Sequence, residues 1–255
     1  MFTPLEQFKI TPIIRIFNDY IDLTITNSTI YMMISVISII ILIWGTQNNL
    51  AFGSKSYIKA FFEILYIKTE EIVNDIIGKN FNKYIPLIFS LFLFILFNNT
   101  IGLIPYSFTT TSHIIVTLTM SLTIMIGLTI IGFYKHSYKF FNLFIPNGLN
   151  KGFTKFIIPL IFAIELISYL SRIISLSVRL AANLMSGHTL LKIICNTSVT
   201  AISSIKSYLI SSILIILPIL LLCALFILET GVSIIQAYVF TLLTTTYIKD
   251  VELLH

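Results

Sequence analysis

The feature that most constrains this chain is a set of long stretches without formal charge. The stretch between Asp22 and Lys55, and the stretch from Tyr84 to Tyr134, contain no Asp, Glu, Lys or Arg. About 20 consecutive apolar residues are enough for a helix to cross a bilayer. The chain has 255 residues, of which 56% are hydrophobic and only 11% are charged, a composition far from that of soluble domains. We therefore expect an all-α integral membrane protein.

The charge-free stretches and the patterns between them predict one membrane domain, residues 1–255, with four helical parts. Residues 29–46 form the first predicted span. Residues 54–78 place apolar and charged side chains on opposite sides, which predicts an amphipathic helix at the membrane surface. Residues 84–134 predict a hairpin of two spans, and residues 156–248 predict a hairpin of two long, tilted membrane helices.

The distribution of basic residues predicts the orientation of these spans. Lysines lie before the hairpin at 84–134 and in the loop at 135–155, whereas the hairpin tip at 107–113 has no formal charge. Basic loops stay on the side of synthesis, so both lysine-bearing segments should share one side.

The net charge of +5 forms no basic patch, so we expect no nucleic-acid partner. Cys195 and Cys223 lack metal-ligand spacing, and neither a metal site nor a cofactor is expected.

Residues 165–188 place four ionisable side chains inside an apolar stretch. A charge at the centre of a spanning helix costs about 2.5–3.5 kcal/mol on insertion scales, so such residues usually mark a path or a partner. On a helix, small residues form one stripe that contains Arg179 and would let a neighbouring helix come close. Glu165, Arg172 and Asn183 flank this stripe. The small residues are Ser168, Ser171, Ser175, Ala182 and Ser186.

A structural role is the alternative for these arginines, with Arg172 and Arg179 paired to Glu165 or Glu229 of the same chain. Glu165 precedes Arg179 by about 21 Å of helix at 1.5 Å per residue, too far for a local pair. Arg15 is the only other arginine in the sequence. Two arginines in one apolar stretch therefore favour a function.

The pattern L-x-x-R-L-x-x-N-x-x-x-G-H begins at Leu176 and ends at His188, and includes Arg179, Asn183 and Gly187. It resembles the penultimate helix of subunit a of the F-type ATP synthase. The histidine after the glycine, and the two ends of the chain, TPLEQFKI and YIKDVELLH, are similar to fungal mitochondrial members. The resemblance covers essentially the whole chain.

This resemblance implies a stator subunit of the membrane proton channel of a rotary ATP synthase, not catalytic on its own. Two offset half-channels would be separated by an essential arginine facing the carboxylates of the c-ring. The implied partners are the c-ring, subunit b, subunit 8, the lipid bilayer and protons. The implied location is the mitochondrial inner membrane, and the absence of a targeting leader at the N-terminus predicts an organelle-encoded protein.

The resemblance also implies roles for single residues. Glu229 matches the acidic residue of the last helix and His188 its mitochondrial partner. Gln236 matches the glutamine opposite the arginine, and Glu165 and Asp250 match the matrix-side acids. The predicted proton-translocating residues are Arg179, His188, Glu229, Gln236, Glu165, Asp250, Asn183 and Arg172.

A symmetric hairpin turning near residues 207–208 places three polar pairs at matching levels: Glu165 with Asp250, Arg179 with Gln236, and His188 with Glu229. The faces do not match in the same way. His188 points away from Arg179 on the first arm, whereas Glu229 and Gln236 share a face on the second. The arrangement of His188 and Glu229 relative to Arg179 therefore stays open.

Three other functions would also place charges in a membrane. A secondary ion transporter would commonly show inverted repeats, and a membrane subunit of a proton-pumping respiratory complex would carry charges in several spans. A passive anchor would not need an arginine in a small-residue stripe. Proton flux that requires an added rotor distinguishes the proton-channel stator from all three.

Overall fold

The computed structural model describes residues 4–14, 17–18, 21–22, 24–47, 57–104, 107–137, 140, 158–204 and 208–252. Several parts of the predictions lie outside the described residues: the ends of two predicted helices at 54–56 and 156–157, most of the lysine-bearing loop, and the turn at 205–207.

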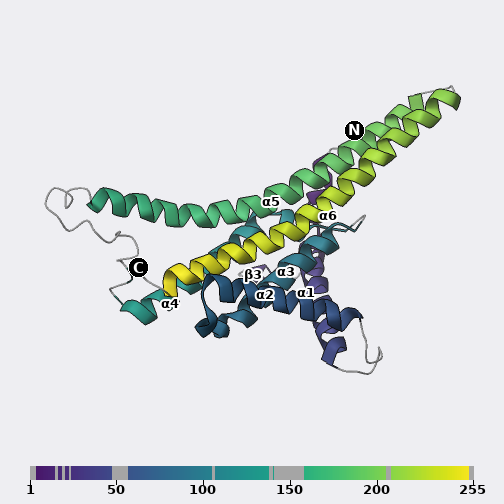
Figure 1. The fold of residues 1–255 in the computed structure, drawn as a ribbon. Helices are drawn as coiled ribbons and strands as arrows, with labels where there is room; N and C mark the ends of the chain where they lie inside the picture. The colour runs from purple at the N-terminus through teal and green to yellow at the C-terminus, as the bar shows by residue number, and fades with distance from the viewer. Residues whose placement is uncertain are drawn as a thin grey trace. The chain divides into compact units, whose positions relative to one another are not determined.

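The chain is built almost entirely of helices (Figure 1). The N-terminal part is the exception, because it begins with a short 3-10 helix and two antiparallel strand pairs, β1 with β4 and β2 with β3. The elements are η1 (Pro4–Phe8), β1 (Pro12–Ile14), β2 (Phe17–Asn18), β3 (Ile21–Asp22), β4 (Ile25–Thr26), α1 (Asn27–Gln47), α2 (Tyr57–Ile76), η2 (Lys79–Tyr84), α3 (Ile85–Gly102), η3 (Thr110–Ser112), α4 (Ile114–His136), α5 (Ile158–Ser204) and α6 (Tyr208–Glu252).

Five helices of the described part are long and apolar enough to cross a membrane, and the all-α membrane class is confirmed. α5 and α6 contain apolar spans of 42 and 35 residues, longer than one perpendicular crossing needs. Helices of this length fit a bilayer by tilting. The candidate spans are Asn27–Gly45, Phe81–Gly102, Ile114–His136, Pro159–Thr200 and Pro218–Glu252.

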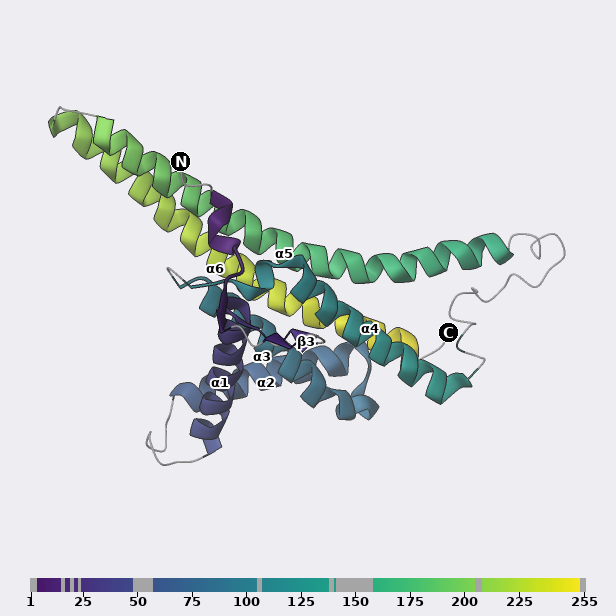
Figure 2. The same ribbon diagram turned by 180° about the vertical axis from the view of Figure 1, so that it is seen from behind.

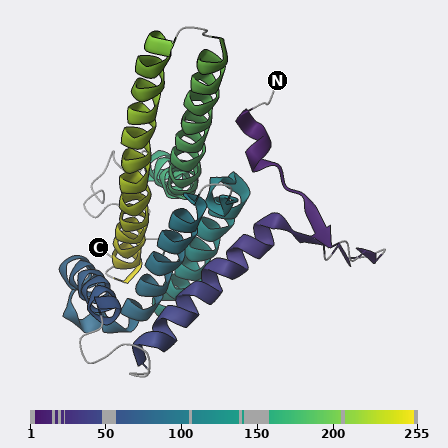
Figure 3. The same cartoon turned by 90° about the vertical axis from the view of Figure 1, so that its right-hand side faces the viewer.

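The chain forms two compact units. The first consists of Met1–Ile41, Phe94–Ile114 and Leu180–Ala237. In it, the second part of α5 and the first part of α6 run side by side in opposite directions, as Figure 3 shows most clearly. The turn between α3 and α4 is closed by side chains, since Thr110 and Thr111 donate hydrogen bonds to Asn98 and Asn99 at 3.0 and 2.8 Å. These bonds satisfy buried amide oxygens that lipid could not.

The second unit consists of Leu42–Leu93, Ile115–Arg179 and Tyr238–His255. α2 contributes a buried side, with Phe62, Thr69 and Val73, and an exposed side with Lys59 and Lys68. The buried side packs in a core shared with α3, α4, α5 and α6. Figure 2 shows the ends of α4 and α6 meeting in this unit. The core residues are Val73, Ile77, Tyr84, Ile85, Ile88, Met125, Leu128, Phe140, Ile173, Ile248 and Val251.

Many hydroxyl groups inside the helices bond to the backbone of their own helix. Ser35, Ser121 and Thr244 donate to carbonyl oxygens three or four residues earlier, at 2.7, 3.0 and 2.7 Å. This local bonding removes the cost of placing an unpaired hydroxyl in an apolar environment. A helix rich in serine and threonine therefore remains compatible with the bilayer.

Candidate functional site

α5 has one covered face and one open face. Ile173, Leu176, Leu180 and Leu184 are buried within the chain. The opposite face carries the small-residue stripe of the sequence together with Arg179. Its members Ser171, Ser175, Ala182 and Ser186 are exposed, as is Arg179, and Ser168 is half-buried. The chain thus leaves uncovered the face whose small residues would admit a neighbouring helix.

Two of the hydroxyls on this open face are turned back onto α5. Ser171 Oγ donates to the carbonyl oxygen of Ser168 at 2.8 Å, and Ser186 Oγ donates to that of Asn183 at 3.1 Å. At these two positions the open face therefore offers a neighbour small side chains whose hydroxyl protons are already used.

The two arginines of α5 differ in their surroundings. Arg172 lies 3.2 Å from Asp250 and 3.6 Å from Glu165, and its guanidinium is 5.6 Å from the centre of the Tyr247 ring. None of the ion pairs between described residues includes Arg179. The structural alternative therefore describes Arg172, which joins α5 to the end of α6, but it finds no acidic partner for Arg179 among the described residues.

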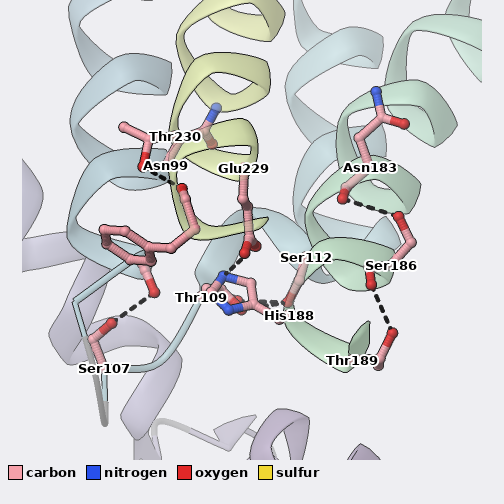
Figure 4. A network of polar contacts seen from close by, with 12 residues as sticks. Asn99, Ser107, Thr109, Ser112, Asn183, Ser186, His188, Thr189, Glu229 and Thr230 are labelled. Atoms are coloured by element: carbon pink, nitrogen blue, oxygen red, sulfur yellow. Dashed lines mark hydrogen bonds and ion pairs between the residues drawn. The ribbon is translucent and has the colours of Figure 1, made fainter. Parts of the chain in front are cut away.

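His188 of α5 and Glu229 of α6 face each other. Their Nε2 and Oε1 atoms are 3.5 Å apart, as Figure 4 shows. The Glu229 side chain is 5% exposed, and its two oxygens form no hydrogen bond within the described part of the protein. Gly187 lets the helices approach here, because a Cβ at this position would lie 2.7 Å from Glu229 Oε1. Sequence numbering had placed these two residues at one level, and the structure brings them together.

The His188–Glu229 pair lies between two cavities. The larger, of about 850 Å³, is lined by His188 but not by Glu229. The smaller, of about 380 Å³, is lined by Glu229, Asn183 and Gln236 but not by His188. We call them the His188 cavity and the Glu229 cavity. An ionisable pair that joins two spaces can pass a proton from one to the other.

Asn99 of α3 supports α6 near this pair. Asn99 donates from Nδ2 to the carbonyl oxygen of Ser233 at 3.3 Å, one turn after Glu229, and its Oδ1 accepts from Thr111. Figure 4 shows Asn99 beside the pair. Sequence reasoning missed this contact. The paired asparagines, at 98–99 in an otherwise apolar helix, were the available signal.

A second group missed by sequence reasoning surrounds Glu252 at the end of α6. Its carboxylate, which is 1% exposed, accepts hydrogen bonds from Lys83, Lys135 and Tyr84. These residues come from η2 and the end of α4, so the group holds three segments together.

The predicted pairing of Arg179 with Gln236 stays a prediction. Among the described residues, no three His, Cys, Asp or Glu side chains are placed to hold a metal ion.

The fold and the site define a multi-pass helical membrane protein whose last two helices carry a histidine–glutamate pair that lines two cavities. The family model described as ATP synthase A chain matches residues 29–249. ATP synthase subunit a of Chondrus crispus is 40% identical over 257 residues, covering 99% of this chain and 97% of the relative. ATP synthase subunit a of Zancudomyces culisetae is 40% identical over 258 residues, covering 100% of both. The chain belongs to the ATP synthase subunit a family.

Proposed function

We propose that this chain is the stator subunit of the membrane proton channel of a rotary F-type ATP synthase. It is not catalytic on its own. It acts in the mitochondrial inner membrane, and its gene lies in the organelle genome. The chain matches the family over essentially its full length, and this supports its assignment to the ATP synthase complex. The structural observation that carries the proposal is the open face of α5, on which Arg179 has no ion pair with a described residue while the opposite face is buried.

In this proposal the c-ring covers the open face of α5. Each ring carboxylate passes the small residues and then Arg179. A guanidinium stays charged at any physiological pH and favours the ionised form of a nearby carboxyl group, whereas lipid favours the neutral form. A ring carboxylate therefore stays ionised beside Arg179 and must be protonated before it can travel through lipid.

One half-channel uses the His188–Glu229 pair. A proton reaches His188 from the His188 cavity, passes to Glu229, and is delivered through the Glu229 cavity, where Asn183 and Gln236 provide polar side chains. The 3.5 Å separation within the pair and the two cavities on its sides support this order. Histidine is the side chain whose unperturbed pKa lies within the physiological range, so it can both accept and release a proton.

The second half-channel uses Glu165 and Asp250 on the matrix side. Both acids contact Arg172, which supports a shared polar site that a leaving proton can cross. Subunit b and subunit 8 complete the membrane stator in this proposal. Arg172 keeps the two acids together, and Arg179 separates this site from the His188–Glu229 pair.

The experiment is Arg179→Gln in the complete complex, reconstituted in liposomes with a pH-sensitive dye. The variant assembles, fails to acidify the liposomes on ATP hydrolysis, and leaks protons passively under an imposed potential, because the barrier between the half-channels is gone. Arg179→Lys also fails substantially, since a buried ammonium can lose its proton. Lys68→Gln, which removes an exposed positive charge from α2, is the control and pumps normally. Normal pumping by Arg179→Gln would refute the proposal.

A further inference from the structure

The His188 cavity has a wall that the proposed proton path does not use. Besides His188 and Lys192 of α5, it is lined by four residues of the N-terminal part: Glu6, Gln7, Lys9 and Thr11. We call residues 6–11 the N-terminal strap. A cavity of about 850 Å³ has room for on the order of ten or more water molecules. The charged groups on its lining, one acid and two lysines, favour water over lipid.

The strap is held in place by its backbone. Asn27 at the start of α1 donates from Nδ2 to the carbonyl oxygen of Lys9 at 3.2 Å, and its Oδ1 accepts from the Thr11 amide at 3.2 Å. The Asn27 amide in turn donates to the Thr11 carbonyl oxygen at 3.2 Å. The β1–β4 pairing continues this attachment. Three hydrogen bonds to one residue fix the strap without any need for apolar burial.

The strap contacts the proton-carrying pair through Phe8. The Phe8 ring meets the His188 imidazole edge-on, with ring centres 6.5 Å apart and planes at 75°. This is a preferred geometry for two aromatic rings. Beside it, Gln7 Nε2 is buried and forms no hydrogen bond within the described residues. The orientation of the imidazole decides whether Nε2 faces Glu229, so the ring that restrains it bears directly on proton transfer.

We propose that Phe8 is a positioning residue for His188 and that the N-terminal strap is the outer wall of a water-filled vestibule leading to the His188–Glu229 pair. This inference rests on the proposed function of that pair. The strap keeps the vestibule next to His188, and Phe8 holds the imidazole with Nε2 toward Glu229. Water in the vestibule supplies the proton that His188 accepts.

The first test compares Phe8→Leu with Phe8→Tyr in the complete complex, with proton-driven ATP synthesis in liposomes as the readout. Leucine fills much of the space but lacks a ring, so synthesis falls about two- to tenfold, the factor expected from loss of one aromatic pair. Tyrosine keeps the ring and retains the wild-type rate. Equal rates for Phe8→Leu and wild type, or an equal loss in both variants, would overturn the positioning role.

Glu229→Gln, measured in parallel, separates this inference from the proposed function. If Glu229→Gln retains full synthesis, the pair does not carry protons and the proposed function fails. If Glu229→Gln is inactive while Phe8→Leu is normal, only the role of Phe8 fails. The two failures are therefore distinguishable in one experiment.

The second test uses Cys195, which lines the His188 cavity and is exposed, as a reporter of water access. In the Cys223→Ser background, a small charged methanethiosulfonate reagent modifies Cys195 in the complete complex. Asn27→Ala removes the two side-chain bonds that hold the strap, keeps the backbone bond from residue 27 to Thr11, and raises the modification rate about tenfold or more. The modification rate of Cys195 is also measured in Phe8→Leu, which changes the strap without a substitution in α1. No modification in any variant would mean that the vestibule holds no water, and equal rates in all of them would mean that the strap is not its wall.

Discussion

Neutralising Glu252 should loosen the end of α6. Its carboxylate is nearly fully buried and accepts hydrogen bonds from two lysines and Tyr84. Glu252→Gln weakens the two bonds that the lysines donate. A hydrogen bond to a charged group is worth about 1.5–3 kcal/mol net. The side chains of Lys83 and Lys135 are 61% and 41% exposed, and water recovers roughly half of that loss. The expected cost is therefore about 1.5–3 kcal/mol.

This cost can be measured by hydrogen exchange of the α6 backbone amides at 246–252 in the solubilised complex. A loss of about 1.5–3 kcal/mol in local opening free energy accelerates exchange roughly 10- to 150-fold. The control is Glu71→Gln, which removes the Lys68–Glu71 pair, whose side chains are 66% and 53% exposed. Solvent screens an exposed pair of this kind, so this variant changes exchange in α2 by less than about fivefold. Equal effects of the two variants would refute the reasoning that burial gives the Glu252 group its weight.

Three further predictions follow from the pair and from the charge pattern. Gly187→Ala places a Cβ 2.7 Å from Glu229 Oε1 and should lower proton-driven ATP synthesis, whereas Gly231→Ala, with nothing within 4 Å, should leave it unchanged; equal rates would contradict the close approach. Glu229→Gln should slow synthesis at every pH while the complex still assembles, and unchanged rates would mean a structural pair. Single cysteines at Thr110 and Gly148 should be labelled by an impermeant thiol reagent from opposite sides of the membrane, and labelling of both from one side would refute the predicted topology.

The positions of the helices were predictable because charge is excluded from lipid. The charge-free stretch from Tyr84 to Tyr134 predicted a hairpin, and it contains α3 and almost all of α4. The common level of His188 and Glu229 was also predictable, because two long antiparallel helices with a short turn fix the register by counting residues. That the side chains of His188 and Glu229 face each other was not predictable. A projection onto straight helices ignores how closely the two helices approach at Gly187.

Long-range polar groups were not predictable. Lys83, Lys135 and Glu252 lie far apart in the sequence, and each by itself is ordinary for the end of a membrane helix. Only the docking of three segments shows that they share one site. The strand pairs of the N-terminal part were missed for a different reason, since pieces of two or three residues are too short to show a periodic pattern.

The hydroxyls of Ser171 and Ser186, which bond to their own helix, affect how easily a neighbouring helix could slide along α5. A serine that pointed outward could form a hydrogen bond with each helix that slides past it, and every such bond, worth about 0.5–1.5 kcal/mol net, would have to break before the next step. Ser171 and Ser186 instead bond to their own helix. Their outer surface is little larger than that of alanine and offers a passing neighbour nothing to catch. In the proposed complex, these two positions would therefore offer little resistance to a passing ring helix, and Arg179 would supply the charge on this face.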